Sequence, residues 1–348
     1  MADKQNTLRN YLSELPDFVF RFIDYYYDGE SVNTQLAFAL DIKIFLNFLI
    51  VTKKFPYDSL EEFSENDMEQ ISVDDLLEYK SYLKQYTLTY TDADGQPYSR
   101  THRNSSFGIN RKMSSLRSLF SYLYKTDKIS QNITLKVDMN KLVQKIKKPL
   151  TLQETMRLMD VILNGEKYFK GRLLTEYLNR KKRDVALYLT YLGTGVRVSE
   201  CVGLDIEDVD FKNNGIKVTR KGGNEMVVYF GPEVEKALKN YLEVRKNIIP
   251  VEGHEHALFY STQRKRIGVQ AVENLVKKYA RQVTTTKKIT PHKLRSTYGT
   301  ALYQETGDIY LVADVLGHKD VNTTKKHYAA LDDSRRRQAA TAVKLRED

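Results

Sequence analysis

Hydrophobic residues in the first third of the chain recur at intervals of three or four positions. Within residues 34–52 they fall at Leu36, Leu40, Ile44, Phe48 and Val51. That spacing lies along one face of a helix and predicts a core-facing stripe. The aromatic segment 17–27 predicts a shorter helix before it, and Ser72 opens a helix that runs to Tyr86. A fourth helix is predicted from the apolar series Ile109, Met113, Leu116, Phe120 and Leu123.

Residues 87–98 interrupt this helical pattern. Residues 87–91 alternate between threonine and larger side chains, Asp94-Gly95 is a turn sequence, and Pro97-Tyr98 follows it. We therefore expect a small β-hairpin or an extended loop between two helices.

The second half of the chain combines helical spacing with short strand-like runs. Thr151 and Glu154 form a capping-box sequence at the start of a helix. Further helices are predicted at residues 181–193 and 232–247. Short strands are predicted at residues 208–211, 215–219, 225–230 and 257–260. Turn sequences join the first three of these strands into hairpins, with Lys221 at one tip.

Length and charge pattern divide the chain into domains. A chain of 348 residues is long enough for about two domains, each with its own core. Residues 136–149 are rich in lysine and end at Pro149, which predicts a basic linker. We therefore expect a helical domain at residues 1–135 and a second domain at residues 150–331. A final helix is expected at residues 332–348, after candidate caps at Asp332, Asp333 and Ser334.

The balance of charge favours a polyanionic partner. Lysine and arginine number 55 against 45 aspartates and glutamates, so the net charge is +10 and the pI is about 9.2. Nucleic acid is the simplest partner of this kind, although a merely basic soluble protein would have the same balance.

Cysteine, histidine and apolar content argue against several other classes of protein. Cys201 is the only cysteine, so no intramolecular disulfide can form, which is typical of the reducing cytoplasm. Its apolar neighbours predict that it is buried. No signal peptide is expected, and the apolar run 45–51 is too short to span a bilayer. No cysteine or histidine spacing predicts a metal site, and His254 and His256 are best explained as surface histidines.

The candidate chemistry gathers between residues 292 and 328. His292 and Arg295 are three residues apart and would lie on one face of a helix. Gly317 precedes His318, as at a helix end where the backbone turns sharply, and Tyr328 is the last tyrosine. A guanidinium, two imidazoles and a phenol, once brought together, suit attack on a phosphodiester.

Two further motifs lie upstream of this segment. Residues 194–200 read Thr-Gly-Val-Arg-Val-Ser-Glu, and residues 219–225 read Thr-Arg-Lys-Gly-Gly-Asn-Glu. With the segment above, these motifs resemble, in order, the active-site boxes of the tyrosine recombinases, the family of Xer proteins and phage or transposon integrases. The six active-site positions of that family would fall on Arg197, Lys221, His292, Arg295, His318 and Tyr328. One departure is that Tyr328 follows His318 by ten residues rather than nine; because residue 327 is histidine, only Tyr328 can serve.

The resemblance implies a role for each residue. Tyr328 would attack phosphorus and form a 3′-phosphotyrosine, while Arg197 and Arg295 hold the non-bridging oxygens. Lys221 would protonate the departing 5′-oxygen, His292 would act as an acid–base group and His318 would hydrogen-bond the phosphate. Glu200 would orient a catalytic cation. Such a reaction needs no cofactor and no metal. Each residue alone has an ordinary explanation, such as an Arg197–Glu200 ion pair, but their joint order favours the recombinase site.

Basic residues outside these motifs are candidates for DNA contact. One group lies in and before the helix of residues 109–123, and a second lies in the linker. They are Arg100, Arg103, Arg111, Lys112 and Arg117, and Lys141, Lys145, Lys147 and Lys148. Contacts with phosphate would hold the protein on the duplex, although a solvated surface would look the same in sequence.

The resemblance also implies a fold and an assembly. The fold would be mainly α with a small antiparallel sheet, in which a helical core-binding domain and a catalytic domain form a C-shaped clamp. The protein would be a cytoplasmic, nucleoid-associated site-specific recombinase acting on double-stranded DNA with an inverted-repeat core site. Four protomers would exchange strands through a Holliday junction, with residues 332–348 docked on a neighbour. Alternatives are a type IB topoisomerase and a non-catalytic DNA-binding protein. The target sequence and the biological role stay open.

Overall fold

The computed structural model describes residues 2–27, 31–52, 54–92, 94–142, 149–220, 222–284, 287–318 and 320–321. The chain forms two compact units, Met1–Gln144 and Lys145–Asp348. The division falls inside the segment 136–149 that the sequence predicts to be a linker. Each unit has its own hydrophobic core.

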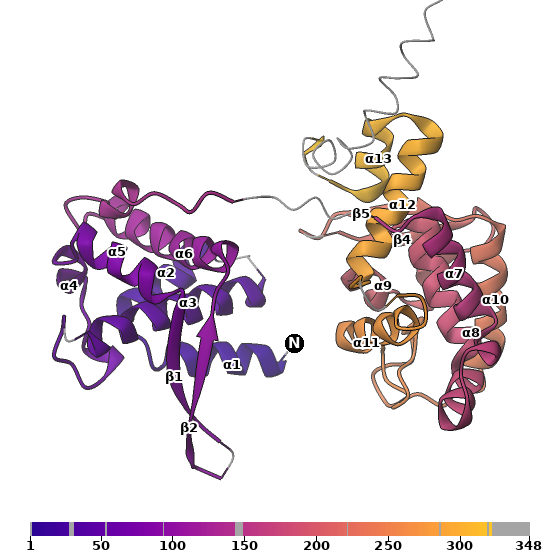
Figure 1. The fold of residues 1–348 in the computed structure, drawn as a ribbon, viewed down its shortest axis with the longest axis horizontal. Helices are drawn as coiled ribbons and strands as arrows, with labels where there is room; N and C mark the ends of the chain where they lie inside the picture. Colours follow the sequence, from indigo (N-terminus) through magenta and orange to yellow (C-terminus); the bar gives the residue numbers. More distant parts are fainter. Residues whose placement is uncertain are drawn as a thin grey trace, which may run out of the picture. The chain divides into compact units, whose positions relative to one another are not determined.

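The N-terminal unit is a bundle of helices around α3 (Figure 1). Its helices are α1 (Ala2–Leu12), α2 (Asp17–Tyr27), α3 (Val32–Val51), α4 (Glu65–Glu69), α5 (Val73–Tyr82) and α6 (Ser106–Lys125). Two short 3₁₀ turns, η1 (Leu60–Glu62) and η2 (Ile133–Lys136), complete it. Helix α3 contacts α1, α2, α5 and α6. It is the central helix because it is apolar on most of its surface.

The buried face of α3 differs from the predicted stripe. Of the predicted residues only Phe48 is fully buried, whereas Ala39, Ile42, Phe45 and Leu49 are completely enclosed. An interval of four residues advances more than one full turn of a 3.6-residue helix, so the predicted stripe drifts around the axis. The predicted stripe on α6 is buried as expected.

Among the described residues, α3 is the one helix long and apolar enough to cross a membrane by length and composition. Its middle residues pack inside the bundle core, and it carries the buried Asp41. These contacts identify α3 as the core helix of a helical unit.

The predicted hairpin is present and longer than expected. Strands β1 (Gln85–Thr91) and β2 (Pro97–Arg103) pair antiparallel, with Tyr86 opposite His102 and Tyr90 opposite Tyr98. Helix α5 ends at Tyr82, because Tyr86 lies in β1 rather than in the helix. In Figure 1 the hairpin extends beyond the helices of its unit.

The C-terminal unit packs helices around a small sheet. Its helices are α7 (Leu152–Leu163), α8 (Gly171–Thr194), α9 (Val198–Gly203), α10 (Pro232–Arg245), α11 (Val269–Ala280), α12 (Pro291–Thr306) and α13 (Ile309–Leu316). The turns η3 (Gly165–Lys167) and η4 (Ile206–Asp208) link them. Strands β3 (Val209–Asp210), β4 (Gly215–Thr219) and β5 (Glu225–Tyr229) form an antiparallel sheet in that order. Helix α8 contacts α7, α10 and α12, and its buried tyrosines fill the core.

Local predictions in this unit are largely confirmed. The Thr151 hydroxyl accepts from the Glu154 amide at 3.2 Å, and the Glu154 carboxylate accepts from the Thr151 amide at 2.9 Å, which completes the capping box. Cys201 is fully buried, as predicted. The predicted strand at 257–260 is wrong. That segment makes only isolated bridges, from Asp205 to Ala257 and from Tyr260 to Arg266. Helix α8 also begins ten residues earlier than predicted.

Candidate active site

The turn after α8 positions Arg197. Helix α8 ends at Gly195, whose φ of 65° lies in the left-handed region that glycine tolerates best. A Cβ on Gly195 would lie 2.4 Å from Cδ1 of Tyr298, so the close approach also requires glycine. The chain then starts α9, with Arg197 at the N-cap. Its backbone amide donates to Oε2 of Glu200 at 2.7 Å.

Glu200 is the centre of the site. Its carboxylate is buried and accepts a hydrogen bond from Nη1 of Arg197 at 2.6 Å. Nη1 of Arg220 lies 3.3 Å from each of its oxygens, and Nη1 of Arg295 lies 3.9 Å from Oε2. A buried carboxylate is stable only with such partners. Glu200 therefore fixes three guanidinium groups that come from α9, the end of β4 and α12.

All three arginines also donate to backbone carbonyls, and two of them, Arg295 and Arg197, are the predicted phosphate ligands. Arg295 donates to the carbonyls of Gly195, at 2.6 Å, and Leu316. Arg197 donates from Nη2 to the carbonyl of Gly317 at 2.8 Å. The Arg295 side chain is buried, whereas that of Arg197 is 34% exposed. Arg197 is thus the more accessible of the two predicted phosphate ligands.

The two candidate histidines lie at helix ends. Helix α12 starts with Pro291 at its first turn, and the hydroxyl of Thr290 caps it by accepting from the amide of Lys293 at 3.3 Å. His292, in that first turn, is exposed, although Arg295 one turn later is buried.

His318 follows the end of α13. Gly317 has a φ of 59°, and its amide donates to the carbonyl of Asp314 at 2.7 Å. The amide of His318 donates to the carbonyl of Ala313 at 2.9 Å, which completes a Schellman motif. The predicted sharp turn before His318 is confirmed. The half-buried His318 is therefore held beside the carbonyls that bind Arg197 and Arg295.

Arg220 is a site residue that the sequence reasoning missed. Its side chain is only 9% exposed, and besides Glu200 it donates to the carbonyls of Val315, at 2.8 Å, and Leu316, at 3.0 Å. Burial lowers its pKa, while the Glu200 charge acts in the opposite direction. The only local sequence feature that marks it is its position at the end of a strand, next to a glycine-rich turn.

Several predicted site residues lie outside the described residues. They are Lys221, Tyr328, Lys145, Lys147 and Lys148, together with the predicted helix 332–348. The strands on both sides of Lys221 are described, and they pair from Gly215 opposite Tyr229 to Thr219 opposite Glu225.

Two of the predicted DNA-contacting cations instead face a buried carboxylate. Arg111 donates from Nη1 and Nη2 to Asp41 at 2.5 and 2.7 Å, and Ser115 Oγ donates to Asp41 at 2.7 Å. Burial raises the pKa of Asp41, and these partners oppose the increase. Because the Arg111 side chain is 52% exposed, it can also face solvent.

Lys112 corrects a prediction. It is only 7% exposed, and Nζ lies 3.4 Å from Oδ1 of Asn104 and 3.9 Å from Oδ1 of Asp41. Burial lowers its pKa. An enclosed ammonium group beside a carboxylate is a structural partner of that carboxylate rather than a surface contact for phosphate.

The remaining predicted cations stay closer to the surface. Arg100, Arg103 and Lys141 are exposed, and Nε of Arg103 donates to Oε1 of Gln85 at 2.9 Å. Arg117 is half-buried, and its Nη2 donates to the carbonyl of Val137 at 2.5 Å.

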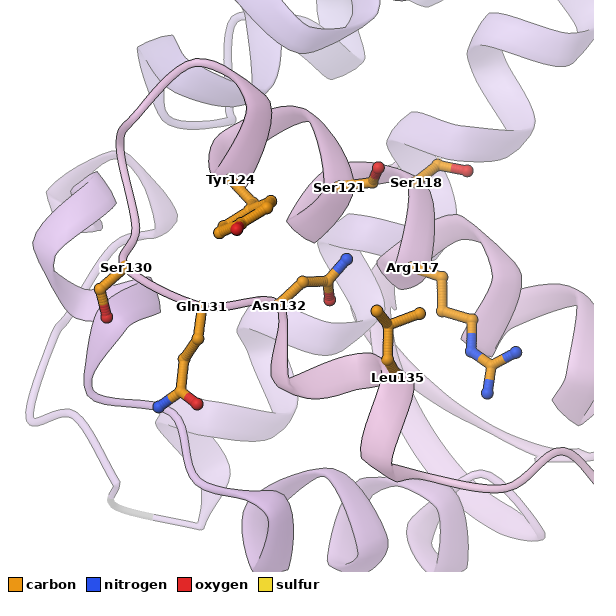
Figure 2. Close-up of a pocket in the computed structure, with 8 residues that line it drawn as sticks. All are labelled: Arg117, Ser118, Ser121, Tyr124, Ser130, Gln131, Asn132 and Leu135. Atoms are coloured by element: carbon orange, nitrogen blue, oxygen red, sulfur yellow. The ribbon is translucent and has the colours of Figure 1, made fainter.

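Arg117 also lines a cavity of about 560 Å³ between α6 and the segment 130–135 (Figure 2). Five of its lining residues carry hydroxyl or amide side chains: Ser118, Ser121, Ser130, Gln131 and Asn132. These groups offer hydrogen bonds of both kinds, beside one guanidinium.

No cluster that could hold a metal ion, three or more histidine, cysteine, aspartate or glutamate side chains together, occurs among the described residues.

Comparison with known proteins identifies the family. The model of the Phage integrase family matches residues 148–335. Tyrosine recombinase XerS of Streptococcus thermophilus is 30% identical over 94% of this chain and 96% of its own length. Tyrosine recombinase XerC of Caldanaerobacter subterraneus subsp. tengcongensis is 32% identical over 96% of this chain and 88% of its own length.

Solved structures share the fold. The XerH site-specific recombinase bound to palindromic difH substrate, in a post-cleavage complex, aligns with a TM-score of 0.67 at 21% identity over 98% of this chain and 89% of that chain. The Tn1549 transposon integrase in complex with transposon right end DNA aligns with a TM-score of 0.64 at 21% identity over 93% and 99%. Together with the family match and the curated relatives, these likenesses lead to one conclusion: the chain belongs to the phage integrase family of tyrosine recombinases and is a DNA strand-transferring enzyme.

Proposed function

We propose that this protein cleaves and rejoins double-stranded DNA at a specific site through a 3′-phosphotyrosine and a Holliday junction. The observation that carries the proposal is the convergence of Arg197, Arg220 and Arg295 on Glu200, beside the end of α13 that leads to His318. Three guanidiniums and one carboxylate leave an excess of positive charge, which suits a phosphate diester.

The proposed role of each residue is the one that the resemblance to the family implies. Tyr328 gives up its phenol proton to His292 and attacks phosphorus, so that a phosphorus–oxygen bond forms to the tyrosine. The bond from phosphorus to the 5′-oxygen breaks, and Lys221 gives that oxygen a proton. Arg197, Arg295 and His318 stabilise the charge on the non-bridging oxygens during attack. A 5′-hydroxyl from the partner strand then reverses the sequence.

The substrate and the assembly are proposed from the family. The XerH structure contains a palindromic substrate, and we propose an inverted-repeat core site for this chain as well. Four protomers would bring two such sites together, and residues 332–348 would dock on a neighbouring protomer. Exposed cations such as Arg100, Arg103 and Lys141 would contact phosphate from the N-terminal side. The cytoplasm is the expected compartment.

The test is covalent trapping on DNA. A duplex carrying the target site and a nick beside the scissile phosphate should yield a protein–DNA band on a denaturing gel, and Tyr328→Phe should yield none. A band with Tyr328→Phe would show that the nucleophile is wrong. Absence of a band with the unaltered protein would favour a non-catalytic DNA-binding protein.

An assay with two differently marked duplexes distinguishes a recombinase from the remaining alternative, a type IB topoisomerase. A recombinase joins an arm of one duplex to an arm of the other, whereas a type IB topoisomerase relaxes supercoils and makes no such product. Recombinant product with no dependence on a specific sequence would contradict the site-specific part of the proposal.

A further inference from the structure

Arg220 has an environment that its sequence position does not predict. Arginine is seldom enclosed unless its donors are satisfied, and the Arg220 side chain is only 9% exposed. It stands at the end of β4, directly before Lys221 in the chain. The question is therefore what an enclosed guanidinium at this position holds together.

Its donors reach three separate parts of the unit. Nη1 lies 3.3 Å from both oxygens of Glu200 in α9 and donates to the carbonyl of Leu316 at 3.0 Å. Nη2 donates to the carbonyl of Val315 at 2.8 Å. Nε lies 2.9 Å from Sδ of Met226 in β5. The last carbonyls of a helix lack partners within it, so Arg220 acts as the cap of α13.

Gly317 shows how closely the guanidinium fits. A Cβ at this glycine would lie 2.6 Å from Cζ and 2.8 Å from Nε of Arg220. The glycine is thus needed both for its left-handed backbone and for the space that Arg220 fills. The next residue is His318. The turn at Gly317 therefore determines both the space that the Arg220 guanidinium occupies and the position of His318.

The backbone of Arg220 is fixed as well. Its amide donates to the carbonyl of Asn224 at 2.7 Å, and its carbonyl accepts from the amide of Gly223 at 3.0 Å. The main chain of Arg220 therefore belongs to the β4–β5 turn while its side chain belongs to the end of α13. Arg220 therefore links the hairpin to the helix end through the hydrogen bonds of its side chain.

We propose that Arg220 is a positioning residue that sets the β4–β5 hairpin against the end of α13, and so places the general acid Lys221 relative to His318 and the arginines. The proposal rests on the proposed function for the role of Lys221. Arg220 itself need not touch DNA, because its donors are directed to Glu200 and to backbone carbonyls.

The main consequence is a defect in leaving-group protonation, because Arg197 and Arg295 keep their own contacts with Glu200. Without Arg220 the hairpin loses its attachment, and a catalytic group that moves by about 1 Å can lose about 10²-fold in rate. A 5′-bridging sulfur removes the need for the acid, because a thiolate leaves without protonation; its conjugate thiol has a pKa of about 8.5. Sulfur should therefore restore cleavage to Arg220→Ala, as it should to Lys221→Ala.

The experiment measures covalent complex formation with oxygen and sulfur substrates. The variants are Arg220→Ala, Arg220→Lys and Lys221→Ala, and the matched control is Arg266→Ala. Arg266 likewise donates to the last carbonyls of a helix, those of Val202, Gly203 and Leu204 in and after α9, and to the carboxylate of Asp205. Any defect of Arg266→Ala should be equal on both substrates. Arg220→Lys retains a charge opposite Glu200, so its rate of covalent complex formation should lie between those of Arg220→Ala and the unaltered protein. If Arg220→Ala does not fold, Arg220→Lys takes its place in the experiment.

A second measurement does not depend on activity. Hydrogen exchange should accelerate in Arg220→Ala at the amides of Gly317 and His318 and along the β4–β5 pairing, while α10 and α11 keep their protection. Unchanged exchange at these amides would overturn the proposal whether or not the protein cleaves DNA.

The kinetic outcomes separate the two proposals. A sulfur-to-oxygen ratio for Arg220→Ala equal to that of the unaltered protein would overturn the role of Arg220. That result means an equal loss of rate on both substrates, as expected of a phosphate ligand or of a general structural defect. If Lys221→Ala is not restored by sulfur, the assignment of the acid fails instead, and hydrogen exchange alone decides whether Arg220 positions the hairpin.

Discussion

Each unit of the molecule contains a buried carboxylate that faces two or more cations, and the two clusters differ in what else these cations bind. Asp41 in the N-terminal unit faces Arg111 and Lys112, together with the Ser115 hydroxyl. Glu200 in the C-terminal unit faces Arg197, Arg220 and Arg295. Both solve the same problem, because a carboxylate removed from water needs compensating charge.

The partners of the cations show the difference. The cations around Asp41 join α3 to α6 inside one bundle. The arginines around Glu200 come from three elements and also bind the carbonyls of Gly195, Val315, Leu316 and Gly317. The first cluster stabilises a core, and the second gathers arginines of the proposed reaction site. Burial of charge alone does not distinguish them; the convergence of separate elements does.

The largest expected effect tests that distinction directly. Glu200→Gln removes the charge that orients three guanidiniums, so we expect the rate of covalent complex formation to fall by about 10²–10³-fold, the usual cost of losing preorganised electrostatic stabilisation. Asp41→Asn should leave the rate of the folded protein unchanged. Rates are measured on a nicked substrate at saturating protein. Equal losses in both variants would show that the comparison is wrong.

A second prediction concerns the stability of the N-terminal unit. Asp41→Ala leaves Lys112 enclosed without its carboxylate, and breaking a buried pair on one side costs about 3–5 kcal/mol. Urea unfolding should show this loss in the transition of the N-terminal unit. The double variant Asp41→Ala with Lys112→Met should recover part of it, because the remaining buried charge is removed. A double variant less stable than Asp41→Ala would contradict the structural role of Lys112.

DNA affinity should separate Lys112 from the exposed cations. Arg100→Ala should lower the dependence of log affinity on log salt by about 0.9 if the side chain contacts one phosphate. Lys112→Met should leave that slope unchanged, since the ammonium group faces Asn104 and Asp41. Titrations at several salt concentrations with target and random duplexes give both slopes. A reduced salt slope for Lys112→Met would show that Lys112 contacts phosphate after all.

The smallest effect concerns single glycines. Gly253, with a φ of 81° and no atom within 4 Å of an added Cβ, reports backbone strain alone. Gly253→Ala should cost about 1–2 kcal/mol of stability and no activity. Gly317→Ala should cost more in stability and also slow cleavage, because its Cβ would displace Arg220 in addition to straining the backbone. Normal cleavage by Gly317→Ala would show that the Arg220 guanidinium can be displaced without loss of activity.

Much of this architecture was predictable from local sequence. The Thr151 cap, the strands β4 and β5, the hairpin between α5 and α6 and the turn at Gly317 depend on residues close together in the chain. The family itself was predictable because each active-site box is a short segment with a recognisable family resemblance.

The rest depends on contacts between distant residues. Arg220 is buried because of Glu200 and the carbonyls of Val315 and Leu316, which lie 95 and 96 residues later. Lys112 is buried because α6 packs against the Asp41 side of α3. The face of α3 was predicted wrongly for a related reason: a helix that is apolar on most sides has no unique stripe, so its neighbours decide which residues are enclosed.

The carboxylate of Glu200 has a consequence for building hybrid recombinases. The segment around residue 197, the end of β4 and the first turns of α12 all contact this carboxylate. These segments should therefore be exchanged between parents together, as one block. A hybrid could take residues 194–226 from one parent and residues 287–318 from another. Glu200, Arg197 and Arg220 would then come from one parent and Arg295 from the other, so the contacts between them would not match. Crossover points for such hybrids therefore belong outside this block, for example in the linker before Pro149, where the two compact units divide.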